Sequence, residues 1–497
     1  MVTNISSIGQ IYKNRYKPDK TAIIFGNERI SFAQLDDKVR AFANFLRGKG
    51  ITRGDKVMLN AGNCPEFIYT YLGCVRNAAV IVPVNPAFTP PELSYIAKDS
   101  DAKLLVIKEE VLLKSGHTEK TLSELLGLTV FVLNEKSMEE IMVSPRDDFD
   151  LVSDIHEVST FLYTSGTTGH PKAAMLTHNN LITNAWQTEV AFEIVHEDIF
   201  MCVLPMFHVL ACTICVLLPL HVGATSVVVE AFHPKTVINS LIENEVTMFT
   251  GVPAMYHVLV EAAKESITFP KLRLAASGGA SLPLEVYHKT KKLLPIVEGY
   301  GLTEASPATN FNPPSGIHKP GSVGPAFPEV EVMIADENDN ELPVGEVGEL
   351  LIRGANVMKG YYKRPQETAE TLRNGWLHTG DLAKMDEDRY VYIVDRKKDI
   401  IIVAGLNVYP REVEEVLYQH PKIRDAAVIG EEDEYRGEAV VAYIVLKEGE
   451  TVRHRDILRW MKERLALYKI PRRLVLVNEL PRTSSGKILK RVLREKS

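Results

Sequence analysis

The sequence predicts an α/β protein with a large N-terminal domain of parallel-rich βα sheets plus an antiparallel β subdomain, and a small mobile α+β C-terminal domain. Three observations lead to this prediction. Short apolar runs alternate with helical patterns in residues 1–300, short alternating strands follow, and a charged run then precedes a compact α+β pattern. At 497 residues and 45% hydrophobic composition, the chain is too long for one ordinary domain.

The strand and helix repetition of the first part indicates parallel sheets, because buried parallel strands are short, apolar and separated by helices. The expected strands lie at residues 56–59, 79–84, 104–107, 225–229, 246–249 and 272–276. Within residues 321–360 the pattern changes. Two alternating segments, VEVMIAD and GELLIRG, flank the turn-rich stretch ENDNELPVGEVG. Turn residues between alternating strands predict the antiparallel β subdomain.

A charged run at residues 395–399, Asp-Arg-Lys-Lys-Asp, interrupts otherwise apolar sequence and marks the expected domain boundary. We predict an N-terminal domain at residues 1–394, a hinge at 395–398 and a C-terminal lid domain at 399–497. The lid pattern predicts helices at 411–418 and 456–467 and strands at 426–429 and 440–446. No internal repeat or low-complexity tract interrupts this order.

Composition indicates a cytoplasmic location and excludes several classes of protein. The five cysteines are an odd number in mostly apolar settings, which predicts reduced thiols rather than a disulfide framework or a zinc site. The N-terminal segment lacks an apolar core of signal-peptide length. Residues 200–229 contain no charged side chain, but prolines, histidines and a glycine interrupt them. We therefore expect a core helix followed by a parallel strand there, and no transmembrane segment.

The charge is unevenly distributed along the chain. The formal net charge is −7, which argues against a nucleic-acid-binding protein, and no aromatic-rich motif supports one. Residues 451–497 nevertheless hold fourteen Lys and Arg against four Asp and Glu. This segment predicts a basic lid that meets an anionic ligand held by the acidic body of the protein. A weak contact with a membrane surface stays open, as does the oligomeric state.

The segment from Tyr163 to Lys172 combines hydroxyl groups, two glycines and a lysine without a carboxylate. A buried strand is expected before it at 159–163 and a helix after it at 178–186, so the segment is predicted to be a loop. Glycines let backbone amides turn toward one point, hydroxyls add donors, and the lysine neutralises charge, as a polyphosphate requires. The residues concerned are Thr164, Ser165, Gly166, Thr167, Thr168, Gly169 and Lys172. The P-loop NTPase pattern fails, because His170 and Pro171 separate the second glycine from the lysine.

This loop resembles the phosphate loop of the adenylate-forming (AMP-binding) enzymes, which include acyl-CoA synthetases, nonribosomal peptide synthetase adenylation domains and firefly luciferase. Further segments follow in the order of that family and span most of the chain. They are LPMFH at 204–208, SGGA at 277–280, GYGLTE at 299–304, WLHTGD at 376–381, the charged run at 395–399 and PRTSSGK at 481–487.

The resemblance implies a role for each motif. Small residues at Gly279, Ala280, Gly299 and Gly301 would let a flat purine approach the backbone, and Tyr300 offers a face for stacking. The family implies that Thr303 touches the α-phosphate of ATP, Glu304 ligates Mg²⁺, and Asp381 with Arg396 holds the ribose. The expected catalytic residues are Lys487, Thr303, Glu304, Lys172 and His208. The acyl pocket would be lined by His208, Val209, Gly278 and Gly279.

The same resemblance implies two half-reactions in one site. ATP and a carboxylic acid would give an acyl-adenylate and pyrophosphate, after which the lid would rotate about Lys398. A second face around Gly405 and Leu406 would then serve attack by CoA. The cofactors and substrates implied are therefore ATP, Mg²⁺, CoA and a carboxylic acid.

Residues 298–307 and 404–414 are most similar to bacterial medium- and long-chain fatty acyl-CoA ligases. Amino acids are disfavoured, because His208 stands where amino-acid adenylation domains carry an aspartate. Asn407 in place of an arginine argues against a very short acid, and Cys212 in place of a gating tryptophan leaves chain length open. The alternatives are an aryl-acid CoA ligase of the cinnamate or succinylbenzoate type and a non-catalytic protein that binds acyl-adenylates.

Overall fold

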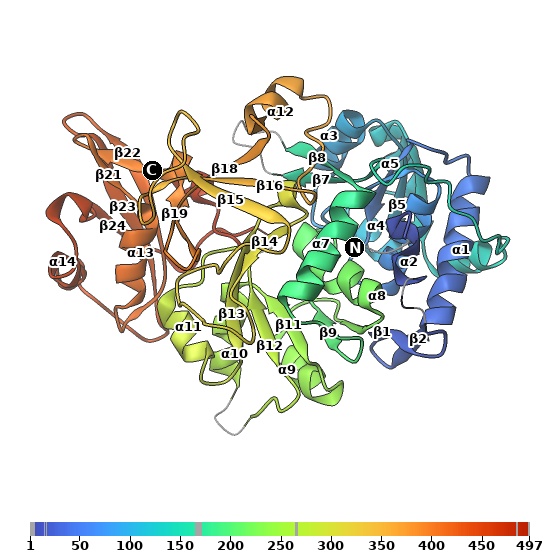
Figure 1. Ribbon diagram of the computed structural model, residues 1–497, viewed down its shortest axis with the longest axis horizontal. Helices are drawn as coiled ribbons and strands as arrows, with labels where there is room; N and C mark the ends of the chain where they lie inside the picture. The colour runs from blue at the N-terminus through green and yellow to red at the C-terminus, as the bar shows by residue number, and fades with distance from the viewer. Residues whose placement is uncertain are drawn as a thin grey trace.

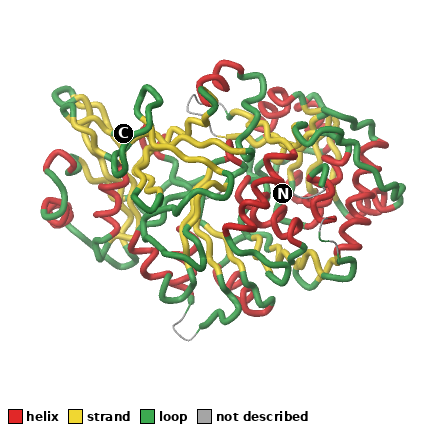
Figure 2. Tube along the Cα trace, viewed as in Figure 1, coloured by secondary structure: helices red, strands yellow, loops and turns green. Residues whose placement is uncertain are grey.

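The computed structural model describes residues 5–13, 15, 17–164, 171–263, 267–483 and 486–495. It confirms the predicted α/β class, with two large parallel-rich sheets, an antiparallel sheet and a separate C-terminal sheet. In Figure 1 the chain starts among the blue helices on one side and ends in the orange and red C-terminal elements on the other. Figure 2 shows strands in both the N-terminal and the C-terminal parts of the molecule, with helices gathered most densely on the N-terminal side.

The largest sheet has eight strands and is parallel except at its two edges. The outer strands β2 and β14 are antiparallel to their neighbours β1 and β13. In spatial order the strands are β14 (Ala308–Phe311), β13 (Ile296–Gly301), β12 (Leu274–Ser277), β11 (Met248–Gly251), β9 (Ile199–Cys202), β10 (Thr225–Val228), β1 (Thr21–Phe25) and β2 (Glu28–Ser31). The short strands are buried along most of their length, as expected for a sheet covered on both faces.

The second large sheet has six strands, and only its last pair is antiparallel. The order is β6 (Thr129–Leu133), β5 (Ala102–Lys108), β3 (Lys56–Asn60), β4 (Val80–Pro83), β7 (Val158–Thr164) and β8 (Lys172–Thr177). Strands β7 and β8 form an antiparallel pair in which Thr164 lies opposite Lys172. The two ends of the predicted phosphate loop are therefore held side by side.

Helices connect and cover these sheets. Helix α7 (His178–Ala191) lies between them, because Leu181, Ile182 and Ala185 pack in an apolar cluster that contains residues of both sheets. Its first turn is fixed by a capping box between Thr177 and Asn180. The other helices of this region are α1 (Phe32–Gly48), α2 (Pro65–Arg76), α3 (Pro90–Ser100), α4 (Glu109–Lys114), α5 (Glu119–Leu126), α6 (Glu135–Met142), α9 (Pro234–Glu243), α10 (Pro253–Ala262) and α11 (Leu284–Thr290).

The uncharged stretch at 200–229 forms a buried helical segment and a parallel strand, as predicted. A π-helical segment at Ala211–Leu217 continues into α8 (Leu218–Val222), and β10 then pairs parallel with β9. Among the described residues, no helix is long and apolar enough to cross a membrane.

The predicted antiparallel β subdomain is present as a third sheet. Strands β15 (Val330–Ala335), β16 (Gly348–Gly354), β18 (Trp376–Met385) and β17 (Leu372–Arg373) follow in that order, and β19 (Val391–Arg396) pairs with β18. Helix α12 (Pro365–Thr371) lies between β16 and β17 in the chain. Each neighbouring pair in this sheet is antiparallel.

The C-terminal sheet begins directly after the predicted hinge. A single 3₁₀ turn at Lys397–Asp399 separates β19 of the third sheet from β20 (Ile401–Val403) of the fourth. The remaining elements are β21 (Leu406–Val408), α13 (Pro410–Tyr418), β22 (Ile423–Asp433), β23 (Gly437–Leu446), α14 (His454–Lys462), β24 (Arg473–Leu476) and α15 (Lys490–Arg494). The limits 1–394, 395–398 and 399–497 remain a prediction.

One strand was not predicted, and one local expectation is wrong. Strand β8 stands between the phosphate loop and α7, because residues 172–177 pair with β7 before the helix begins. The second lid helix ends at Lys462 instead of extending to residue 467.

Candidate active site

A cavity of about 1180 Å³ lies between the N-terminal sheets and the lid. Its walls come from segments that are far apart in the sequence, including the loop after β12, the end of β13, the middle of β18 and the C-terminal segment around Lys487. The predicted site residues among its lining are Gly279, Ala280, Gly299, Tyr300, Gly301, Asp381, Arg396, Lys398 and Lys487. The structure thus gathers the predicted adenine and ribose residues with the hinge and the lid lysine around one space.

Asp381 and Arg396 stand opposite each other on the antiparallel strands β18 and β19. Arg396 Nε lies 3.2 Å from Asp381 Oδ1, and the Tyr300 hydroxyl donates to Asp381 Oδ2 at 2.5 Å. Asp381 is only 6% exposed, so its carboxylate is held firmly in the cavity wall. Burial and this carboxylate raise the pKa of Tyr300, and the hydroxyl therefore remains a donor.

The two glycines of the GYG motif have a structural reason beyond space for a purine. A Cβ at Gly301 would come within 2.2 Å of the Pro307 carbonyl oxygen, and one at Gly299 within 2.5 Å of the Phe311 ring. Strand β14 approaches β13 so closely that only glycine fits at these two positions. The interpretation of Gly299 and Gly301 as adenine-facing positions alone was incomplete, although both line the cavity.

His208 and Val209 precede the π-helical segment, beside the loop that carries Gly278 and Gly279. Val209 is buried, and His208 Nδ1 accepts a hydrogen bond from the Leu210 amide at 3.3 Å. Burial, with the Lys487 ammonium as a second cause, lowers the pKa of His208 to about 4. The imidazole is therefore neutral at physiological pH and does not offer an anchor for a charged substrate group.

Lys487 enters the cavity from the lid. Its amide donates to Thr483 Oγ1 at 3.1 Å, and the Thr483 amide donates to the Lys487 carbonyl at 2.8 Å, which closes a tight turn. Gly486 in this turn has a φ of +84° and packs against Val252 of the N-terminal domain. Burial first, and then the positive charge of Arg396, lower the pKa of Lys487 to about 8.

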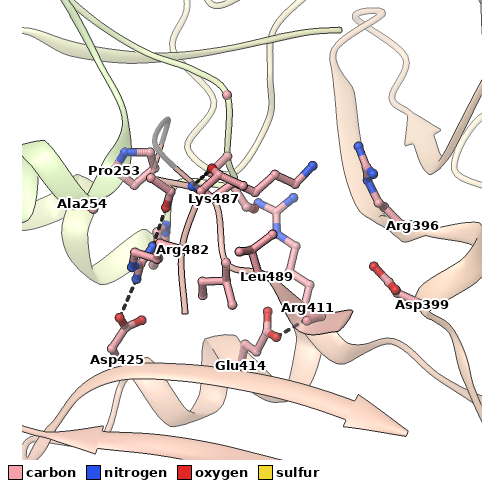
Figure 3. Close-up of a pocket in the computed structure, with 18 of the residues that line it drawn as sticks. Pro253, Ala254, Arg396, Asp399, Arg411, Glu414, Asp425, Arg482, Lys487 and Leu489 are labelled. Carbon is pink, nitrogen blue, oxygen red and sulfur yellow. Dashed lines mark hydrogen bonds and ion pairs between the residues drawn. The ribbon is translucent and has the colours of Figure 1, made fainter. Parts of the chain in front are cut away.

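Figure 3 shows the neighbours of this turn. Arg482 lies between Asp425 and the segment that carries Lys487, whereas Arg396 and Asp399 belong to a separate segment on the other side of the view. Arg482 contacts Asp425 at 2.5 Å and donates to the Gly486 carbonyl at 2.7 Å. These contacts fix the turn relative to the lid sheet.

Several predicted site residues are not among the residues that line this cavity: Thr164, Lys172, His208, Val209, Gly278, Thr303 and Glu304. Thr303 and Glu304 lie in a short 3₁₀ segment after β13, and Lys172 is the first residue of β8. Glu304 Oε1 accepts a hydrogen bond from the Tyr361 hydroxyl at 2.7 Å. Lys172 Nζ lies 3.7 Å from Glu367 Oε1.

Only part of the predicted phosphate loop falls in the described structure. Thr164 ends β7 opposite Lys172. The other loop residues that sequence reasoning singled out, Ser165, Gly166, Thr167, Thr168 and Gly169, lie outside the described residues.

The residues around Glu304 fit Mg²⁺ that arrives with a nucleotide. Within the described ranges, no cluster of three or more His, Cys, Asp or Glu side chains could hold a metal by itself. A site with a single carboxylate suits Mg²⁺, which is commonly bound through one or two carboxylates together with substrate phosphates. Glu304 would supply that carboxylate.

The structure does not bring Gly405 and Leu406 to the cavity. Gly405 lies in the turn between β20 and β21, where Ala404 and Gly405 both have positive φ angles, and Leu406 is the first residue of β21. Leu406 is 50% exposed. In this arrangement of the lid, the two residues expected to serve CoA are not part of the cavity that Lys487 lines.

The basic C-terminal segment is largely neutralised within the lid, which differs from the sequence expectation. Its Lys and Arg side chains pair with carboxylates of α13, β22 and the hinge turn, because those elements pack against it. Lys487 has no such carboxylate within 4.0 Å among the residues that the structure describes. The pairs include Lys469 with Glu412, Arg472 with Asp433, Arg473 with Glu431, Arg482 with Asp425, Lys490 with Glu414 and Arg494 with Asp399.

Sequence reasoning missed several residues of this region. Arg411 donates its amide to Asp395 at 2.8 Å and its guanidinium to the Ile393 carbonyl at 2.5 Å, so it ties α13 to β19 beside the hinge. Glu298 is buried in the cavity wall and accepts from the Leu282 amide at 3.0 Å. The only sequence signal for Glu298 was its place directly before the GYG motif. Tyr361 carried no signal, because its contact with Glu304 spans 57 positions.

A nucleotide-sized cavity between a large α/β domain and a small α+β lid, with a lysine delivered from the lid, defines the class of two-domain adenylating enzymes. The family model described as AMP-binding enzyme matches residues 12–362, and the model for the AMP-binding enzyme C-terminal domain matches residues 412–487. The chain belongs to the AMP-binding enzyme family.

Within this family, the chain is similar to acid–CoA ligases. The chain is 35% identical to a long-chain-fatty-acid–CoA ligase of Bacillus subtilis, over 96% of this chain and 92% of that one. It is also 35% identical to a feruloyl-CoA synthase of Amycolatopsis sp., over 98% of both chains. Among solved structures, ATP-bound MatB from Rhodopseudomonas palustris superposes with a TM-score of 0.93 at 30% identity, covering 100% of this chain and 99% of that one.

Proposed function

We propose that this chain activates a medium- or long-chain fatty acid with ATP and transfers the acyl group to CoA, releasing AMP and pyrophosphate. The observation that carries this proposal is the meeting of Lys487 with Asp381, Arg396 and Tyr300 around one cavity. Adenylation needs a carboxylate that accepts hydrogen bonds from the two ribose hydroxyls. It also needs an ammonium ion at the α-phosphate. The substrate carboxylate attacks the α-phosphorus, and the leaving pyrophosphate departs toward Lys172.

The lid lysine supplies the charge for this step. Negative charge builds on the α-phosphate oxygens as the carboxylate attacks, and a positive group fixed nearby stabilises the transition state more than the ground state. Lys487 is held by its turn against Val252 and has no competing carboxylate at ion-pair distance among the described residues. Mg²⁺ bound through Glu304 would neutralise phosphate charge.

The surroundings of His208 favour an apolar acid. Leu204, Ala211 and Val252 form a small buried apolar cluster, and Leu210 and Met255 pack against it. Burial keeps His208 neutral, so neither the cluster nor the imidazole would bind an ammonium or carboxylate group on the far end of a substrate. Fatty acids fit this description, and relatives from Bacillus subtilis and Escherichia coli are long-chain-fatty-acid–CoA ligases.

An aryl acid is the second candidate. The feruloyl-CoA synthase relative has the same identity to this chain as the Bacillus relative and a closer length. The structural relatives also include an anthranilate CoA ligase and an o-succinylbenzoate CoA synthetase, at 27% and 28% identity. A flat aromatic acid would occupy the same apolar surface next to Gly278 and Gly279.

The second half-reaction would require movement of the lid. Gly405 and Leu406 lie away from the cavity here, so transfer to CoA would need a rotation about the segment at Lys398 that exchanges them with Lys487. Such a rotation would let one cavity serve both steps. The 3₁₀ turn at 397–399 is the chain segment that joins the third sheet to the fourth, which supports its role as the hinge.

A panel of carboxylic acids separates these candidates. CoA-dependent AMP formation would be measured with saturated fatty acids of increasing length, ferulate, cinnamate and o-succinylbenzoate. The proposal expects kcat/KM to be highest for a fatty acid of eight or more carbons, at roughly tenfold or more above any aryl acid. A preference for an aryl acid would replace the first candidate with the second. Absence of acid-dependent pyrophosphate exchange with every acid would favour a non-catalytic binding protein.

A further inference from the structure

Tyr361 connects two charged residues that sequence reasoning treated separately. Its hydroxyl donates to Glu304 Oε1 at 2.7 Å, and its ring centroid lies 5.5 Å from Lys172 Nζ. The Tyr361 hydroxyl is the donor in this hydrogen bond, because an ionised carboxylate oxygen can only accept. The same side chain therefore contacts the proposed metal-binding carboxylate and faces the proposed phosphate-binding lysine.

The backbone holds Tyr361 rigidly between these two partners. Residues 359–362 run alongside β8, where the Tyr362 amide donates to the Ala173 carbonyl and the Met175 amide to the Gly360 carbonyl, each at 2.9 Å. The Tyr361 amide donates to Thr368 Oγ1 at 2.9 Å. On the other side, the Met358 amide donates to the Glu304 carbonyl at 2.8 Å. Tyr361 is thus fixed to the strand of Lys172 and to the 3₁₀ segment of Glu304.

Lys172 is held on two sides. The Tyr361 ring offers a face to its ammonium group, and Glu367 of α12 lies 3.7 Å away. Its side chain is only 13% exposed, so it is placed before any ligand binds. Glu304, by contrast, depends on one hydroxyl donor for the orientation of its carboxylate, since Tyr361 is the one described side chain that donates to it.

We propose that Tyr361 is a positioning residue that orients the Glu304 carboxylate toward magnesium-bound ATP. This inference rests on the proposed use of ATP by the same site. A carboxylate that is already fixed does not have to be ordered when the metal and phosphates bind. The affinity for magnesium-bound ATP is higher because this ordering cost is avoided. Tyr361 makes no contact of its own with the reacting atoms in this account.

The adjacent Tyr362 provides a matched control. Its hydroxyl also donates to a carboxylate, Asp101 Oδ2 at 2.8 Å, and its ring packs on Phe161 with the centroids 4.6 Å apart. Asp101 is on the surface, at a position unrelated to the site. Tyr361→Phe and Tyr362→Phe therefore remove the same group from neighbouring positions, and only the first touches Glu304.

The test measures binding of ATP in the presence and absence of Mg²⁺ by calorimetry, without acid or CoA. We expect Tyr361→Phe to raise the Kd for ATP with Mg²⁺ about tenfold, the scale of a lost hydrogen bond to a charged group, and Tyr362→Phe to change it less than about twofold. Without Mg²⁺, all three proteins should bind ATP equally. In a Glu304→Gln background the further change Tyr361→Phe should have less than about a twofold effect, because the two residues act as a unit.

Two results would overturn the inference. One is an unchanged Kd in Tyr361→Phe, and the other is a full tenfold loss that persists in the Glu304→Gln background, which would place the effect on Lys172 or on the fold. Acid-dependent pyrophosphate exchange by the wild-type protein is measured in parallel. If the wild type binds ATP with Mg²⁺ but shows no exchange, the proposed function fails while the role of Tyr361 stands.

Discussion

The pKa of Lys487 makes the pH dependence of adenylation a sharp prediction. Burial and the positive charges of Arg396 and Lys398 lower the pKa of this ammonium group to about 8, against the opposing effect of Asp381 and Asp399. A lowered lysine pKa means that the charge is present below pH 8 and is lost as the pH rises through 8. About 90% of the free enzyme would carry the charge at pH 7 and about 10% at pH 9, which predicts a decrease of about ninefold in kcat/KM.

The assay is acid-dependent exchange of pyrophosphate into ATP, measured as kcat/KM at limiting ATP between pH 6.5 and 9.5. A Lys487→Arg variant supplies the internal control, because a guanidinium group stays charged throughout this range. Its activity should be lower, since the geometry differs, but nearly flat between pH 7 and 9. The buried Glu298, whose pKa burial raises to about 7, would titrate in both proteins at lower pH.

An equal decrease above pH 8 in the wild type and in Lys487→Arg would refute this reasoning. The titrating group would then be another residue, and the ammonium of Lys487 would not be the source of the pH profile. A matched substitution at an exposed lysine of α14, Lys462→Arg, should leave the wild-type profile unchanged.

Two further substitutions test the nucleotide site and the hinge. Asp381→Ala should raise the KM for ATP by about tenfold or more and leave the KM for the acid within about twofold, because its partners would be ribose hydroxyls. Both constants are measured by steady-state kinetics, and equal changes in the two would assign Asp381 a structural role. Lys398→Pro should keep pyrophosphate exchange but reduce acyl-CoA formation by about tenfold or more, because proline fixes φ near −65° where the backbone must rotate. Lys398→Ala removes the same charge without restricting φ and should retain CoA transfer, and full CoA ligation by the proline variant would place the hinge elsewhere.

The parts of the fold that the sequence predicted are those with a local pattern. The apolar run 104–107 lies within β5, the run 272–276 overlaps β12, and the alternating segments at 321–360 form the antiparallel pair β15 and β16. These patterns are visible within a few residues of chain. Strand β8 was missed because residues 172–177 are held extended by segments that meet them only in the folded chain, namely β7 and residues 359–362.

The residues of the candidate site also divide into those that a local sequence motif predicts and those that depend on contacts in the folded chain. Motif residues such as Tyr300, Asp381 and Lys487 were found by resemblance, and the structure gathers them around one cavity. The contact between Tyr361 and Glu304 and the steric need for glycine at 301 depend on segments that meet only in the folded chain. No composition or periodicity reports such contacts. The cytoplasmic location and the role of magnesium remain predictions.

The most direct test of the account compares the two half-reactions in one variant, Lys487→Ala. Pyrophosphate exchange reports formation of the acyl-adenylate, and thioester formation from purified acyl-adenylate and CoA reports the second step. The account predicts that exchange falls by about two to three orders of magnitude, the scale for loss of one transition-state contact, while thioester formation stays within about threefold of the wild type. An equal loss in both half-reactions would contradict the claim that Lys487 serves adenylation alone.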